Sequence, residues 1–191
     1  MIEQVFVFLV GIGLAASVGL RVFLPILIVS IFAYTGNLTL STYFTWLGYL
    51  PVMILLILIS ALEILAYYIA WLDNYLDAIE HPLSIIAGIL ITGAVITDFN
   101  PYLKWLMALL IGGGVAGMIN AATSMIRLKT SAETGGKKNF IVSSIEAAAA
   151  IVLSIISILQ PFVAGLITAL AIIYFSFIIR KKFLSPVKEE N

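Results

Sequence analysis

The sequence predicts an all-α, polytopic membrane protein of about six transmembrane helices, arranged as two inverted three-helix repeats. The first observation is composition, because 62% of the 191 residues are apolar and only 10% are charged. Soluble domains carry about 45 to 50% apolar and about 25% charged residues, so an ordinary soluble domain is excluded. The second observation is the recurrence of long uncharged stretches, and the third is a similarity between the two halves of the chain.

Six segments result when the uncharged stretches are divided at prolines, glycines and polar clusters. The third, of about 15 residues, is either a tilted, partly sheltered span or a half-helix. Gln160 and Pro161 interrupt a run that is too long for one crossing, so we expect a tight hairpin there. We treat 1–191 as one transmembrane domain, with repeat halves 1–98 and 99–184 and a polar tail, 185–191. The segments are 5–34, 50–72, 83–97, 102–126, 140–159 and 162–179.

The distribution of Lys and Arg sets the predicted orientation, because basic residues near span ends are retained in the cytoplasm. Six spans place both termini on one side, and Lys104 is the only basic residue that falls on the other. We therefore expect a multi-pass protein of the cytoplasmic (cell) membrane, with both termini and the loops 73–82 and 127–139 in the cytoplasm. The basic residues on that side are Arg127, Lys129, Lys137, Lys138, Arg180, Lys181, Lys182 and Lys188.

Small residues recur with the same spacing in the first and fourth segments. Since each half holds three spans, the second half would enter the membrane from the opposite side, an inverted repeat typical of secondary transporters. The alternative is that such rows only let helices pack closely, and they could join two copies of the chain as readily as two halves. The rows are Gly11, Ala15 and Gly19, and Gly113, Gly117 and Ala121.

Three ionisable residues fall well inside the predicted spans: Arg21, Glu63 and Glu146. Such charges are costly in lipid and need a partner. Glu63 and Glu146 lie about 13 Å and about 9 Å from the cytoplasmic surface, so the two carboxylates could face one another and share a proton or exchange it for a cation. The alternative is that each carboxyl hydrogen-bonds a Ser or Tyr near it on its own helix.

Arg21 is expected in the outer half of its helix, beyond direct reach of either carboxyl group. Pro25 cannot donate to the carbonyl of Arg21, so the helix should kink or break there and expose backbone polar groups, which would make an anion-binding or gating point. The alternative readings are that Arg21 extends toward the membrane surface or locks two helices through a bidentate pair.

Two polar stretches are candidates for a cytoplasmic mouth. Asp73, Asp77 and His81 would share one helix face, with Glu80 adjacent, and could attract cations or bind a divalent ion. A solvated loop is the simpler reading of that stretch. The other stretch holds Arg127, Thr134, Gly135 and Asn139; its cations could meet a headgroup or phosphate, but it lacks the order of a phosphate-binding loop.

Several segments together resemble a known family over nearly the whole chain, the bacterial membrane proteins grouped as domain of unknown function 4126. The resemblance implies a compact multi-span protein and supplies no activity, cofactor or catalytic residue. Lys137 and Lys138 make the loop after Gly136 more basic than expected for the family. The segments are Gly19-Leu20-Arg21-Val22-Phe23-Leu24-Pro25, Leu62-Glu63, Asp73 to Asp77, Pro82, Gly112-Gly113-Gly114, Thr134-Gly135-Gly136 to Asn139, and Glu146.

The leading functional hypothesis is a small transporter or ion-permeation protein, linked to protons or cations through Glu63 and Glu146, with Arg21 as gate or counter-charge. The alternative is a non-transporting membrane scaffold or assembly factor whose buried charges only hold helices together. A lipid-modifying enzyme is third, because no hydrolase or metalloprotease spacing occurs, and we do not expect an enzyme. Expected partners are the lipid bilayer, a proton or small cation and a second copy of the chain; neither a cofactor nor nucleic acid is expected.

Overall fold

The computed structural model describes residues 2–66, 69–97, 99–135 and 139–184, and every regular element in these ranges is helical. The chain begins with α1 (Ile2–Leu20) and α2 (Phe23–Tyr34). A 3-10 helix, η1 (Thr42–Gly48), precedes α3 (Leu50–Ala66) and α4 (Ala70–Val95). A continuous run follows, made of α5 (Pro101–Met107), a π-helical stretch η2 (Ala108–Gly113) and α6 (Gly114–Thr134). The last two helices are α7 (Asn139–Leu159) and α8 (Pro161–Leu184).

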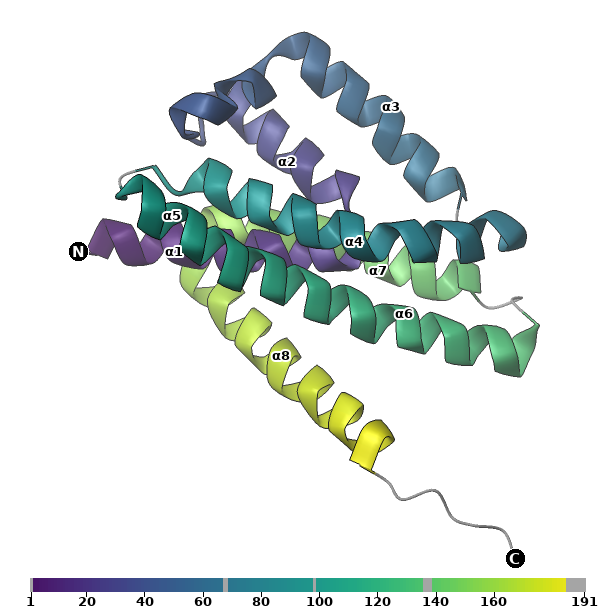
Figure 1. Cartoon of the computed structure of the whole chain (residues 1–191). Coiled ribbons are helices and arrows are strands. Elements are labelled where there is room, and N and C mark those ends of the chain that lie inside the picture. The colour runs from purple at the N-terminus through teal and green to yellow at the C-terminus, as the bar shows by residue number, and fades with distance from the viewer. Residues whose placement is uncertain (1, 67–68, 98, 136–138, 185–191) are drawn as a thin grey trace, which may run out of the picture.

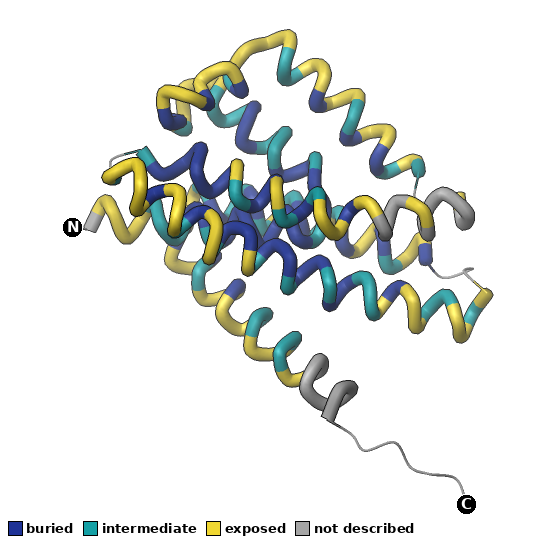
Figure 2. Tube along the Cα trace, viewed as in Figure 1, coloured by how far each residue is buried: buried dark blue, intermediate teal, exposed yellow. Residues whose placement is uncertain are grey.

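Helix α1 lies at the centre and packs against α4, α6, α7 and α8. Figure 1 shows α1, α4, the α5–α6 run and α7 lying along one common direction. The pair α2 and α3 lies on one side of this bundle, and α8 diverges on the other. Buried positions gather where the central helices meet, whereas α3 and α8 are largely exposed (Figure 2).

Apolar side chains cover the outside of the described structure as well as its interior. Leu14 and Val18 are 0% exposed, yet Leu62 and Phe177 are 65% and 68% exposed. By length and composition, three described helices could cross a membrane, Glu3–Leu20, Pro101–Thr134 and Asn139–Leu159. A fourth crossing is added if η1 and α3, bent by 69°, count as one span. This pattern is compatible with a membrane protein, although it identifies fewer than the six spans expected.

The chain breaks at Arg21 and Val22, as Pro25 predicts. Because Pro25 has no N–H to donate to the Arg21 carbonyl, the helix loses a hydrogen bond there, and α1 ends at Leu20 while α2 begins at Phe23. Residues 5–34 are therefore two helices. In Figure 1, α2 turns back toward the end of the bundle where α1 begins.

Two segments expected to be loops are helical instead. The segment 73–82 lies within α4, which continues through Pro82, so 83–97 is mostly the second half of a 26-residue helix rather than a short element. Likewise α6 continues through Arg127 to Thr134. Both stretches are polar, so hydropathy ends the spans too early. Within them, Glu80 and Arg127 are buried and compensate one another by pairing.

The two ends of the described chain lie toward opposite ends of the bundle. The turn between α7 and α8 falls at Gln160, where the hairpin is expected. Phe6, near the start of α1, packs edge-on against Phe162 with ring centroids 4.8 Å apart, whereas α8 ends toward the other side (Figure 1). The expectation of both termini on one side of the membrane treats residues 5–34 as one crossing, whereas these residues form two helices; the placement of the termini in the cytoplasm stays a prediction. The tail 185–191 lies outside the described residues.

The two rows of small residues lie where helices cross. A Cβ added to Gly19 would lie 2.6 Å from the Ala116 carbonyl oxygen, so the backbones of α1 and α6 nearly touch. Ala15 is fully buried and Ala121 half-buried. Three further members face side chains of α4: Gly11, Gly113 and Gly117.

Another close backbone approach joins α4 to η2 and involves neither row. A Cβ on Gly88 would lie 2.5 Å from the Gly112 carbonyl oxygen, and a Cβ on Gly112 would lie 2.5 Å from that of Gly88. Real Cβ atoms essentially never come this close, so glycine is required at both positions.

Candidate functional site

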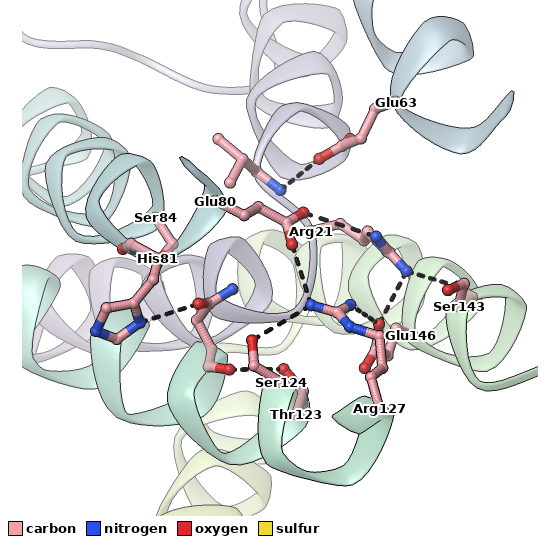
Figure 3. A network of polar contacts seen from close by, with 12 residues as sticks. Arg21, Glu63, Glu80, His81, Ser84, Thr123, Ser124, Arg127, Ser143 and Glu146 are labelled. Atoms are coloured by element: carbon pink, nitrogen blue, oxygen red, sulfur yellow. Dashed lines mark hydrogen bonds and ion pairs between the residues drawn. The ribbon is translucent and has the colours of Figure 1, made fainter. Parts of the chain in front are cut away.

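Four charged side chains converge where α1 ends (Figure 3). They are Arg21 at the α1–α2 break, Glu80 of α4, Arg127 of α6 and Glu146 of α7. Their exposed fractions are 1%, 5%, 0% and 6%. We call these four residues the Arg–Glu cluster. Because a buried charge is costly unless it is paired, the cluster ties four helices together.

Each arginine of the cluster contacts both carboxylates. Arg21 Nη2 lies 2.8 Å from Glu146 Oε2, and Arg21 Nη1 lies 3.6 Å from Glu80 Oε1. Arg127 Nη2 lies 3.1 Å from Glu80 Oε2, and Arg127 Nη1 pairs with Glu146 Oε2. The result is a closed ring of alternating charge. Outside the ring, Arg21 also donates to the Ser143 carbonyl at 3.3 Å.

Glu63 binds the backbone of the break beside the cluster. Its Oε1 accepts from the Val22 N–H at 2.9 Å, and the Phe23 N–H lies 3.4 Å and 3.3 Å from its two carboxylate oxygens. These N–H groups belong to the first turn of α2, where no intrahelical carbonyl is available. The carboxylate therefore caps α2 and faces the positive end of its dipole.

The contacts of Arg21, Glu63 and Glu146 differ in part from those expected. Arg21 joins helices through ion pairs, as in one of the alternative readings, although its two nitrogens contact different carboxylates. Arg21 does not extend to the surface and does reach a carboxylate, because α1 and α7 bring it level with Glu146. Glu63 and Glu146 both lie at the break, in keeping with their similar expected depth, but they take different partners. Glu63 binds backbone amides, and Glu146 binds guanidinium groups.

Glu80 and Arg127 are the members that the sequence reasoning placed elsewhere, in polar loops. A signal for both was present in the helical spacing. Glu80 continues the buried face of α4, and Arg127 continues that of α6. The positions that share these faces are Ser84, Ala87 and Ile91 on α4, and Ala116, Asn120 and Thr123 on α6.

His81 lies at the surface of the protein and forms a hydrogen bond with a residue on the buried face of α6. Its ring is exposed, and its Nδ1 lies 3.0 Å from the Oδ1 of Asn120. Asn120 is 0% exposed. The side chains of Asp73 and Asp77, expected on the same face as His81, lie outside what the structure describes. Among the described residues, no three His, Cys, Asp or Glu side chains are grouped to hold a metal ion.

The other expected mouth residues form the turn between α6 and α7. Gly135 adopts a left-handed conformation, φ 60°, and its N–H donates to the Ser131 carbonyl, which caps α6. Thr134 donates its hydroxyl to the Thr130 carbonyl at 2.7 Å, and Asn139 donates to Ser131 Oγ at 2.5 Å. Their described contacts are those of a helix end.

Among the described side chains, the acids at this site outnumber the bases. Glu63, Glu80 and Glu146 lie at the α1–α2 break with Arg21 and Arg127, so full ionisation of these five groups leaves one excess negative charge. One proton or one monovalent cation would neutralise it. A proton on Glu146 would also weaken its pairing with both arginines, since charge-assisted hydrogen bonds depend on the ionised acceptor.

Comparison with known families gives a match over most of the chain. Residues 8–181 match a family model described as Domain of unknown function (DUF4126). That range contains the Arg–Glu cluster and Glu63. Comparisons with curated proteins and with solved structures found no match.

Proposed function

Because the chain belongs to the DUF4126 family, whose description assigns no activity, we propose a function from the site itself. The protein is a small membrane transporter or ion-permeation protein, linked to protons or monovalent cations through the Arg–Glu cluster and Glu63. The observation that carries this proposal is the buried ring of two carboxylates and two guanidinium groups, with a third carboxylate, Glu63, bound to the backbone of the α1–α2 break beside it. Ionisable groups held within membrane helices are characteristic of ion pathways and proton relays.

The cluster couples ion binding to helix position in this proposal. Glu146 joins α7 to both arginines, and Glu80 joins α4 to the same pair. A proton or cation at either carboxylate weakens one set of contacts and leaves the other, so the helices can shift relative to one another. Arg21 thus acts as counter-charge in one state and as gate in the other.

Irregular helices, one of them at the cluster, support a transport function. The α1–α2 break places unsatisfied N–H groups of a half-length helix inside the protein, where Glu63 binds them. Broken helices of this type form ion and substrate sites in secondary transporters. The π-helical η2, which packs against α4, belongs to a class of distortion frequent at functional sites.

The inverted repeat and the membrane orientation are part of the proposal. The first half contributes Arg21, Glu63 and Glu80, and the second half contributes Arg127 and Glu146, so in each half an arginine is followed by a glutamate on a later apolar helix. Such a correspondence is expected if the halves share an ancestor.

We place the end of the bundle that carries Lys129 in the cytoplasm, by the basic-residue rule. The arrangement in Figure 1 then favours the start of α1 on the opposite side of the cell membrane.

Electrical recording on the full chain in proteoliposomes tests the ion site without knowledge of the substrate. On a solid-supported membrane, a jump in proton or Na⁺ concentration should produce a transient charge displacement as the ion enters the cluster. Glu63→Gln and Glu146→Gln should each reduce the displaced charge about tenfold or more, because each removes an ionisable carboxyl group that the site needs.

Glu133→Gln is the matched control, since Glu133 is 63% exposed and pairs only with the exposed Lys129 among the described residues. It should retain the wild-type charge displacement. Equal signals from wild type, Glu63→Gln and Glu146→Gln would reject the proposed ion site.

A membrane scaffold is the second candidate, favoured by the closed ring of ion pairs across α1, α4, α6 and α7. In this case the charges serve only to fix the helices. The wild-type protein would then show no charge displacement, while Glu146→Gln would lower the temperature of unfolding.

A further inference from the structure

A polar pocket lies at the end of the bundle away from the Arg–Glu cluster. It has a volume of about 340 Å³ and is formed by the segment before η1, the residues after α4 and the start of α5. Hydroxyl groups are frequent in its lining, which includes Thr39, Ser41, Thr42 and Thr97. Lys104 and Trp105 complete one wall.

Lys104 is the basic group of this pocket, and it is only 6% exposed. Its ammonium donates to Ser41 Oγ at 2.7 Å and lies 6.0 Å from the centre of the Trp105 ring. Within the described ranges, no carboxylate lies within 4.0 Å of this ammonium. Among the described groups, this buried positive charge faces a hydroxyl and an aromatic ring, neither of which carries a counter-charge.

The pocket is held in shape by backbone and ring contacts. The Ser41 N–H donates to the Ala94 carbonyl at 2.8 Å, which fixes the hydroxyl acceptor of Lys104 against the end of α4. Phe44 packs on Trp105 with ring centroids 6.3 Å apart. These contacts fix the groups around the Lys104 ammonium, so its position is defined by the packed interior.

Exposed aromatic side chains surround this end of the protein. Tyr43 and Tyr102 are 81% and 89% exposed, and Trp46 is 48% exposed. Tyr and Trp concentrate at the level of lipid headgroups. We propose that the Lys104 pocket binds a phosphate group, carried either by a phospholipid headgroup or by a free solute. The ammonium supplies the counter-charge, and the surrounding hydroxyls donate hydrogen bonds to phosphate oxygens. This site is independent of the ion site above.

Protection of Lys104 from reductive methylation tests the proposal on the full chain. The protein is held in maltoside micelles, which contain no phosphate, and modification of each lysine is followed by mass spectrometry. Sodium phosphate is compared with sodium chloride at equal ionic strength. At a phosphate concentration of about four times Kd, the rate of methylation of Lys104 should fall about fivefold, because about one fifth of the sites then hold no phosphate. Exposed Lys129 should react at an unchanged rate.

A second arm distinguishes the source of the phosphate. Phosphatidylglycerol added to the micelles should protect Lys104 more strongly than free phosphate if a headgroup is the ligand. The temperature of unfolding should rise saturably with whichever source binds. Lys104→Gln should abolish this rise, and Lys129→Gln should preserve it. If Lys104→Gln does not fold, the methylation measurement on wild type alone decides the question.

The proposal is overturned if neither source protects Lys104, or if chloride protects it equally. It is also overturned if protection appears only in Asp98→Asn. Asp98, which lies between the lining residues Thr97 and Phe99 in sequence and outside the described ranges, would then be the internal partner of Lys104.

Discussion

Single charged residues decide how the central helices of this protein fit together. Arg127 is 0% exposed and pairs with two carboxylates. Lys129 lies two residues further along α6, and its side chain is 76% exposed. A positive charge therefore contributes differently to the free energy of unfolding at these two nearby positions. Removing one partner of a buried pair leaves the other uncompensated and costs about 3 to 5 kcal/mol, whereas exposed pairs contribute about 0 to 1 kcal/mol.

Arg127→Met should therefore lower the free energy of unfolding by about 3 to 5 kcal/mol, since it leaves Glu80 and Glu146 with fewer counter-charges. Reversible unfolding in mixed micelles, followed by circular dichroism, measures this change. Lys129→Met is the control and should stay within about 0.5 kcal/mol of wild type. The double variant Arg127→Met, Glu80→Gln should recover part of the loss; equal effects of the two single variants would contradict the burial of Arg127.

At the scale of elements, departures from regular helix are concentrated around the centre of the fold. The α1–α2 break exposes the N–H groups that Glu63 binds, and η2 widens the helix opposite α4. The contact between α4 and η2 depends on two glycines whose backbones approach closely. A regular helix with side chains at these positions would hold α4 away from the α5–α6 run and would draw Glu80 away from Arg127.

Gly88→Ala should accordingly destabilise the protein by about 1 to 3 kcal/mol, the usual cost of overpacking a filled interior. Unfolding in micelles and charge displacement should be measured on the same preparation, since the shift of α4 should disturb both. Gly114→Ala provides the matched control, because nothing lies within 4 Å of a Cβ built there. That control should be neutral or slightly stabilising, as Ala favours helix over Gly. A neutral Gly88→Ala would show that α4 and η2 are not in close contact.

For the whole molecule, the return of α2 changes the orientation that we propose for the start of the chain. The start of α1 lies beside the α7–α8 turn, and the end of α6 lies at the other end of the bundle. Basic residues gather after α6 and at the end of α8. The basic-residue rule therefore favours the cytoplasm for the end of α6 and the outside for the start of α1.

Single cysteines can test this orientation on a clean background, because the natural chain contains none. In intact cells, a membrane-impermeant maleimide should label Gln4→Cys and Tyr102→Cys, both of which lie at the outer end. Lys129→Cys should be labelled only after the membrane is permeabilised. If Gln4→Cys is protected together with Lys129→Cys, the start of the chain is cytoplasmic and residues 5–34 cross the membrane once.

The sequence by itself determined the class of the protein and several local features. Composition identified a helical, apolar chain, Pro25 located the break at Arg21, and Gln160 with Pro161 located the turn between α7 and α8. The presence of charges inside apolar segments also singled out Arg21, Glu63 and Glu146. All of these depend on local properties, namely the hydropathy of a segment, the missing N–H of proline and the cost of a charge in lipid.

Only the tertiary structure decided which charges meet. Glu80 and Arg127 resemble solvated loop residues in the sequence because polar stretches surround them, yet both are buried since α4 and α6 turn those stretches toward each other. Arg21 reaches Glu146 across a sequence separation of 125 residues, a distance over which no periodicity carries information. The partner of a buried charge is set by the packing of whole helices, and helix packing is a property of the assembled chain.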